Sequence, residues 1–192
     1  ELARLRLDLI GDGWQVLWHS APIGSTVATV KSQIVSDYNQ QGISTVFLLG
    51  EIPVPYAGNA AWDGHPEHQG AWPADIYYGD IQSAFWNDFS VNTANNGAQP
   101  NRPETVNVPL DGKFDNSFMP NASELAVGRV DFSNLSEATF GTTRTELYRR
   151  YLDKNHRWRS KQYTVDNKAL VDDNFGYFNG EAFAANGYRN GY

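Results

Sequence analysis

Apolar residues recur at helical spacing in two segments near the start of the chain. The first predicts a helix over 1–10 with no N-cap residue ahead of it. The second predicts a helix over 25–42, with Ser25 as N-cap and Gly42 at its end. The apolar positions are Leu2, Leu5 and Leu9 in the first and Val27, Val30, Ile34 and Tyr38 in the second.

A continuous apolar run at 44–50 follows the second helix. Such a run is typical of a parallel strand buried on both faces. With a strand of mixed character predicted at 14–20, it makes a strand–helix–strand unit. This order predicts an α/β fold, in which a mostly parallel sheet has helices on both faces and a right-handed crossover.

Residues 51–123 break the alternation of helix and strand. Nearly all the prolines lie in this loop-rich insertion, which contains one predicted strand, at 75–81. A region this long with little regular structure is more often functional or ion-stabilised than accidental. Regular patterns then return as a strand at 125–130, a long helix at 137–158 and a strand at 168–172.

Composition and charge exclude several classes of protein. The 192 residues suffice for a single domain over 1–192 with its own core. The net charge is −7 and no run of Lys and Arg occurs, which argues against a nucleic-acid partner. No apolar run approaches the roughly 20 residues of a membrane span. Because the chain has no cysteine, it contains neither a disulfide nor a thiol nucleophile.

Acidic residues follow three of the predicted strands. They are Glu51, Asp80 and the pair Asp172 and Asp173. Ligands and catalytic groups of an open α/β sheet collect outside the carboxyl ends of its strands, so Asp172 and Asp173 are candidate catalytic residues. Adjacent residues of an extended chain point in opposite directions, so one of the two would face a given site. The alternative is an N-cap or Asx turn that starts the following loop.

A second set of aspartates lies in the loop-rich insertion. Their oxygens are hard ligands on flexible loops, which suits calcium better than magnesium. Asp111 and Asp115 are spaced like the first and fifth ligands of a calcium loop, although the rest of that pattern is missing. The alternative is that these residues are turn formers exposed to solvent. The candidate calcium ligands are Asp75, Asp80, Asp88, Asp111 and Asp115.

Several segments, taken in order, resemble the opening of gingipain-type cysteine peptidases, which have a caspase-like α/β fold. The most specific part is the Val-Gly-Arg strand followed by a helix that carries a tyrosine. The resemblance covers most of the chain in order, and 87–123 is weakly matched. After the helix at 25–42, the matching segments are 46–53 (VFLLGEIP), 74–80 (ADIYYGD), 125–130 (LAVGRV) and 146–151 (ELYRRY).

The resemblance implies that this chain is the front part of a secreted or cell-surface cysteine endopeptidase that acts on protein or peptide substrates. The family's catalytic histidine and cysteine would then lie beyond Tyr192, on the remainder of the polypeptide or on a second processed chain. The isolated chain would be inactive. Asp172 or Asp173 would orient the histidine. The family also binds calcium, which favours Asp80 and its neighbours as ligands.

The alternative is a non-catalytic module with the same caspase-like fold. Calcium would stabilise it, and it would serve in surface attachment or assembly.

Overall fold

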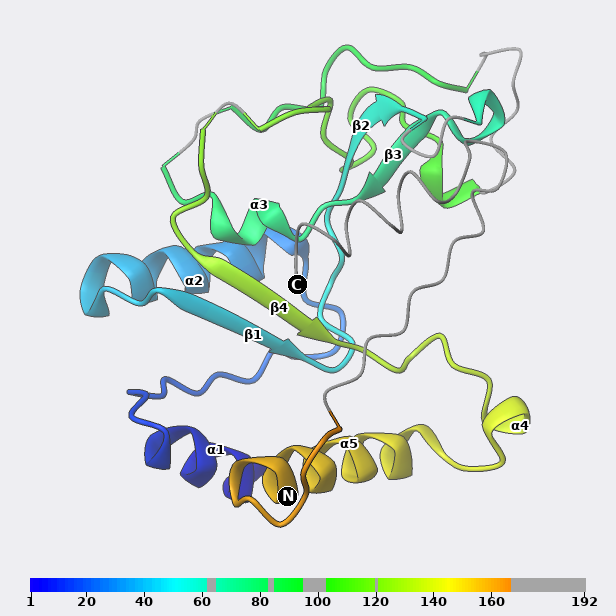
Figure 1. Ribbon diagram of the computed structural model, residues 1–192. Coiled ribbons are helices and arrows are strands. Elements are labelled where there is room, and N and C mark those ends of the chain that lie inside the picture. The colour runs from blue at the N-terminus through cyan, green and yellow to red at the C-terminus, as the bar shows by residue number, and fades with distance from the viewer. Residues whose placement is uncertain (62–64, 83–84, 95–102, 120, 167–192) are drawn as a thin grey trace. The chain divides into compact units, whose positions relative to one another are not determined.

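The computed structural model describes residues 1–61, 65–82, 85–94, 103–119 and 121–166 (Figure 1). They fall into two compact units: one is Leu17–Tyr148, and the other combines Glu1–Val16 with the described residues from Arg149 to 166. The described part is a mixed α/β structure with a small parallel sheet. The prediction of one domain stays a prediction, and the strand predicted at 168–172 lies outside the described residues.

Most of the predicted elements are present with slightly shifted ends. The helix predicted at 137–158 is divided in two, because Gly141 adopts the left-handed conformation, with φ of 61°, and ends the first piece. The helices are α1 (Leu2–Gly11), α2 (Val27–Gln41), α3 (Ile76–Gly79), α4 (Glu137–Phe140) and α5 (Arg144–Arg159). The strands are β1 (Thr45–Leu49), β2 (Tyr56–Ala60), β3 (Gly70–Pro73) and β4 (Ala126–Val130), with 3-10 turns at Pro66–His68 and Pro103–Thr105.

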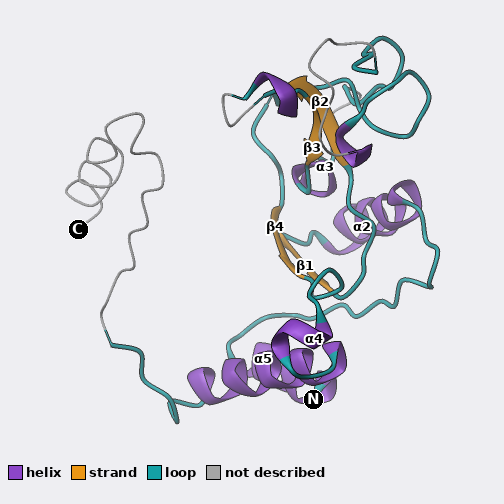
Figure 2. Cartoon of the chain, turned by 90° about the vertical axis from the view of Figure 1, so that its right-hand side faces the viewer, coloured by secondary structure: helices purple, strands orange, loops and turns teal. Residues whose placement is uncertain are grey.

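The core of the unit Leu17–Tyr148 lies between α2 and the parallel pair β1–β4. Figure 2 shows α2 on one side of this pair. The predicted apolar stripe of α2 faces the core, where Ile34 is buried beside Leu48 of β1. The ends of α2 also follow the prediction closely, except that Thr26, and not Ser25, caps it by accepting the backbone N–H of Thr29. The buried residues of the core cluster are Ile34, Leu48, Tyr78 and Leu125.

The two faces of β1 differ in their exposure. Phe47 pairs with Gly128 across the sheet, and its side chain is 42% exposed. Leu48, on the opposite face, is buried. The expected burial of 44–50 on both faces is therefore met on one face only.

Two predicted strands are wrong. Residues 14–20 form no strand: they are largely exposed, and no strand of the described residues pairs with them. Residues 75–81 contain the single helical turn α3, in which the backbone N–H of Asp80 donates to the carbonyl of Ile76. Strand propensity depends on packing against neighbours. Here the buried Tyr78 and the close approach of Gly79 to Ser123 require a turn instead.

The loop-rich insertion is more ordered than its sequence suggests. β2 and β3 form an antiparallel pair with an irregularity between Ala57 and Ala60. Ala57 also bridges to Phe114 in parallel, which ties the later loop to the hairpin. Polar residues make up part of the interior of this region, since Thr93 and Asn107 are fully buried.

In the other unit, α1 and the part of α5 from Arg149 to Arg159 run side by side in the same direction. Arg4 pairs with Asp153 at 3.2 Å, Asp8 pairs with His156 at 2.9 Å, and Asp12 pairs with Arg159. Leu5 and Leu152 are buried in this unit. None of the described helices combines the length and the apolar character that crossing a membrane requires.

Candidate functional site

Arg129, in β4, joins three segments that are far apart in the sequence. Its Nε and Nη2 donate to the two carboxylate oxygens of Asp75, at 2.7 and 2.8 Å. Its Nη1 and Nη2 donate to the carbonyl oxygens of Ile52 and Pro53, at 2.5 and 3.1 Å. Asp75 precedes α3, and Ile52 and Pro53 follow β1. A single guanidinium therefore fixes the start of α3 and the chain leaving β1 against β4.

Tyr78 also contacts the segment that follows β1. Its hydroxyl donates to the carbonyl of Pro53 at 2.7 Å, and the residue is completely buried. Burial raises the pKa of Tyr78 well above its usual value, so the hydroxyl remains a donor at physiological pH. The segment that follows the carboxyl end of β1 is therefore held in place by both Tyr78 and Arg129.

Polar side chains gather just beyond the carboxyl ends of β1 and β4. Glu51 follows β1 and lies 3.4 Å from Nη1 of Arg144, in an exposed ion pair. Asp131 follows β4 and accepts a hydrogen bond from the Tyr148 hydroxyl at 3.3 Å, and that hydroxyl accepts the Phe132 N–H at 2.9 Å. The prediction that Glu51 lies at the carboxyl edge of the sheet is confirmed. The carboxyl edge of the sheet therefore carries the carboxylates of Glu51 and Asp131 and the guanidinium of Arg144.

The other acids predicted for this edge are not brought to it. Asp172 and Asp173 lie outside the described residues. Asp80 follows the turn α3 rather than a strand, and it is only 2% exposed. Its Oδ2 accepts the indole N–H of Trp86 at 2.7 Å.

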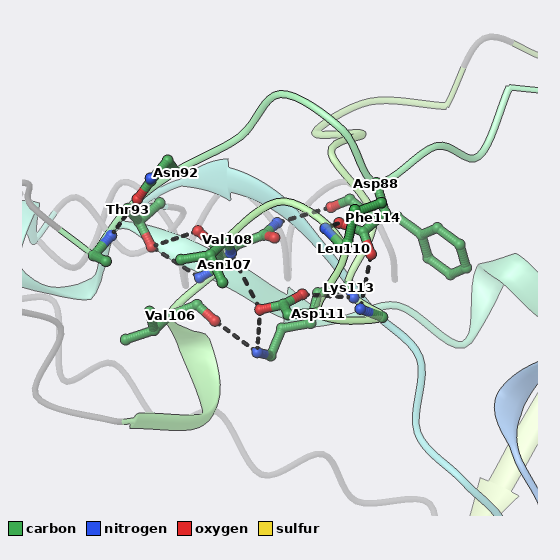
Figure 3. A network of polar contacts seen from close by, with 12 residues as sticks. Asp88, Asn92, Thr93, Val106, Asn107, Val108, Leu110, Asp111, Lys113 and Phe114 are labelled. Carbon is green, nitrogen blue, oxygen red and sulfur yellow. Dashed lines mark hydrogen bonds and ion pairs between the residues drawn. The ribbon is translucent and has the colours of Figure 1, made fainter.

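Asp88, Asp111 and Asp115 bind backbone N–H groups of two neighbouring loops. The carboxylate of Asp88 accepts the N–H groups of Leu110 and Gly112, at 2.8 and 2.7 Å (Figure 3). Asp111 accepts the N–H of Val108 at 3.1 Å and the Nζ of Lys113 at 2.8 Å.

Asp115 closes the other side of the same loops. Its Oδ2 accepts the N–H groups of Phe89 and Ser90, both at 2.9 Å. Its Oδ1 accepts the N–H of Val91 at 3.0 Å.

These contacts bear on the predicted calcium ligands. Asp75 is paired with Arg129, Asp80 with Trp86, and the other three with backbone N–H groups. Over the described ranges, no group of three or more His, Asp or Glu side chains is placed to hold a metal ion. These hydrogen bonds are the contacts that the carboxylates make within the described chain, and the calcium assignment stays a prediction.

Two residues that organise this region were not predicted to be site residues. Arg129 could have been noticed as a charged residue within an apolar strand, where an unpaired charge is costly. Asn107 carries no such signal in an asparagine-rich region. It is fully buried, and its amide donates to the carbonyls of Gly58 and Phe114 at 3.1 and 3.0 Å. Among the described residues, its Oδ1 is the one buried side-chain nitrogen or oxygen atom that has no hydrogen-bond partner.

Lys31 of α2 contributes a partly buried cation near Asp80. Its Nζ donates to the backbone carbonyls of Tyr77 and Asp80, the latter at 2.6 Å, and lies 4.8 Å from the centre of the Tyr77 ring. Burial lowers the pKa of Lys31 from 10.5 to about 8, although the charges of Asp80 and Glu124 act in the opposite direction.

This pKa predicts how stability depends on pH. Between pH 8 and 10.5 the unfolded chain keeps the Lys31 proton while the folded chain has lost it, so this group makes unfolding less favourable as pH rises. We expect Lys31→Met to flatten that rise relative to the wild type and to the control Lys154→Met. Urea unfolding at pH 7, 8, 9 and 10 measures it. Identical slopes in all three proteins would contradict the burial of the amine.

Comparison with known proteins does not assign the chain to a family: no family model, no curated protein and no solved structure gives a significant match.

Proposed function

We propose that this chain is the front part of a caspase-like cysteine endopeptidase domain of the gingipain type, secreted or exposed at the cell surface. One observation carries the proposal. Three of the segments that resemble this family, 46–53, 74–80 and 125–130, meet at the guanidinium of Arg129. Motifs that contact one another through a buried charge act as one structural unit, which supports reading them together.

In this proposal the described residues form a scaffold and the reacting groups come from elsewhere. The chain has no cysteine, so the thiol nucleophile would belong to the remainder of the polypeptide or to a second processed chain. By the resemblance, the histidine base would lie there too. Arg129 and Tyr78 hold the exit of β1 in place. Catalytic groups of α/β folds collect at the carboxyl ends of the strands, so the segments that follow these ends must be held in fixed positions.

By the same resemblance, Asp172 or Asp173 would orient the catalytic histidine and stabilise its charged form. An asparagine keeps the size of the side chain but removes the charge and favours the wrong histidine tautomer. In the parent protein, we expect Asp172→Asn or Asp173→Asn to lower kcat for peptide hydrolysis at least about a hundredfold. The melting temperature should stay close to that of the wild type.

The matched control is Asp153→Asn, because this aspartate lies on the exposed side of α5, with a side chain 52% exposed. It should leave kcat unchanged. A thiol alkylating reagent should abolish the activity of the parent protein. Full activity in both Asp172→Asn and Asp173→Asn, or activity that resists alkylation, would overturn the proposal.

A further inference from the structure

Three large apolar side chains are exposed on the loops 85–91 and 107–116, which we call the clamped loop pair. They are Phe85, Phe89 and Leu110, and the last two are the most exposed. Phe89 is 71% exposed and Leu110 is 78% exposed. The two loops are joined at these positions, because the N–H of Leu110 donates to Asp88, the residue before Phe89. Folding of the described chain therefore leaves the large apolar side chains of Phe89 and Leu110 exposed on loops that are joined to each other.

The backbone beneath both side chains is fixed by carboxylates. Asp88 accepts the N–H of Leu110, and Asp115 accepts the N–H of Phe89. Hydrogen bonds to charged acceptors are shorter and stronger than neutral ones. The two apolar side chains are therefore presented by a pre-formed backbone, which reduces the entropy lost when a partner binds.

Leu110 also has an unfavourable backbone conformation. Its φ is 68°, in the left-handed region that favours glycine and asparagine. A leucine at this position lowers the stability of the turn relative to asparagine. Since its side chain is exposed, burial within the described chain does not compensate for this cost. Residues held in such conformations cluster at binding sites.

The loops around the two side chains are negatively charged. Asp88, Asp111 and Asp115 carry three carboxylates, and Lys113 supplies one cation that is already bound to Asp111. Burial by itself raises the pKa of Asp111 and of Asp115, but their hydrogen bonds to Lys113 and to the Phe89 region outweigh it, so both pKa values are lowered. Both groups therefore stay ionised at neutral pH.

We propose that the clamped loop pair is a docking surface for a cationic, apolar segment of another protein, with Phe89 and Leu110 as its anchors. A few side chains commonly supply most of the binding energy of an interface, and complementary charges select the partner. A second copy of the chain brings the same negative surface and is repelled. Anionic lipid is repelled for the same reason. The inference does not depend on peptidase activity.

The experiment uses two synthetic peptides of twelve residues with the same leucine and tryptophan positions, one with lysine and the other with glutamate at the remaining positions. Binding of each to the intact chain is followed by fluorescence anisotropy at 50 and 300 mM NaCl. We expect the lysine peptide to bind at least tenfold more tightly than the glutamate peptide, with weaker binding at high salt.

Two variants test the anchors. Phe89→Ser and Leu110→Asn should each weaken binding of the lysine peptide at least fivefold. Leu110→Asn should also raise the melting temperature, since asparagine tolerates the left-handed conformation. Ile23→Ser is the control, because Ile23 is fully exposed outside the clamped loop pair, and it should bind like the wild type.

Three results would overturn the proposal. One is unchanged binding in Phe89→Ser and Leu110→Asn, which would place the peptide elsewhere. Another is preferential binding to zwitterionic lipid vesicles that the two variants lose, which would make this a membrane surface. The third is a concentration-dependent dimer of the wild type that both variants abolish, which would make the second copy the partner.

Discussion

Replacing Gly70 with alanine is expected to destabilise the unit Leu17–Tyr148 by about 3 kcal/mol. Gly70 opens β3, where an added Cβ would lie 2.1 Å from the carbonyl oxygen and 2.9 Å from the carbonyl carbon of Thr105. Both obstacles are backbone atoms of a buried residue, so no side-chain rotation removes the clash. Either β3 or the turn Pro103–Thr105 must move, and the pairing of β3 with β2 is weakened.

Urea unfolding measures the effect, with near-UV circular dichroism as a signal of the aromatic environment. Trp72 of β3 is a local reporter, because its indole N–H donates to the carbonyl of Ala60 at 3.0 Å. The control is Gly128→Ala, where an added Cβ meets no atom within 4 Å. That change should alter the free energy of unfolding by less than about 0.5 kcal/mol. Equal stability of the two variants would show that β3 does not pass Thr105 this closely.

The substitution Arg129→Leu is expected to cost about 3 kcal/mol of stability. It leaves the Asp75 carboxylate without its cation and the carbonyls of Ile52 and Pro53 without a donor. The side chains of Arg129 and Asp75 are only 15% and 28% exposed, so water replaces the lost partner poorly. This loss of stability lies at the lower end of the range for broken buried ion pairs, because the Asp75 carboxylate retains some contact with solvent.

A double-mutant cycle separates the ion pair from the packing of the arginine side chain. Asp75→Asn combined with Arg129→Leu should cost clearly less than the two single changes added together, because no charge is left unpaired. Arg144→Leu is the matched control, since its pair with Glu51 is exposed, and it should cost less than about 1 kcal/mol. Similar losses in Arg129→Leu and Arg144→Leu would contradict the role given to Arg129.

The elements α1, α2, β1 and β4 could be predicted because each is specified by its own segment. α2 has its apolar stripe, a capping hydroxyl and Gly42 at the left-handed end, and all three signals are local. β1 and β4 have continuous apolar runs. The segment 75–81 could not be predicted in this way. Its aromatic residues favour a strand locally, but Gly79 must pass within contact of Ser123, which is remote in the sequence.

The candidate site was predicted only in part, because its contacts join segments that are remote in the sequence. The aspartates of the insertion were predicted as calcium ligands, with turn formers exposed to solvent as the alternative, and the calcium assignment stays a prediction. Their partners were not predictable, because Asp88 binds Leu110 and Asp115 binds Phe89, each more than twenty residues away. The role of Arg129 depends on Asp75, which is 54 residues earlier.

The sequence by itself determined the positions of α1, α2, β1 and β4, the acidic character and the absence of a thiol nucleophile from the chain. These properties follow from composition and from periodicity within one segment. Only the tertiary structure decided that three motifs meet at Arg129, that the aspartates bind N–H groups and that Phe89 and Leu110 stay exposed. A local pattern shows which groups need partners, and folding determines which distant groups supply them.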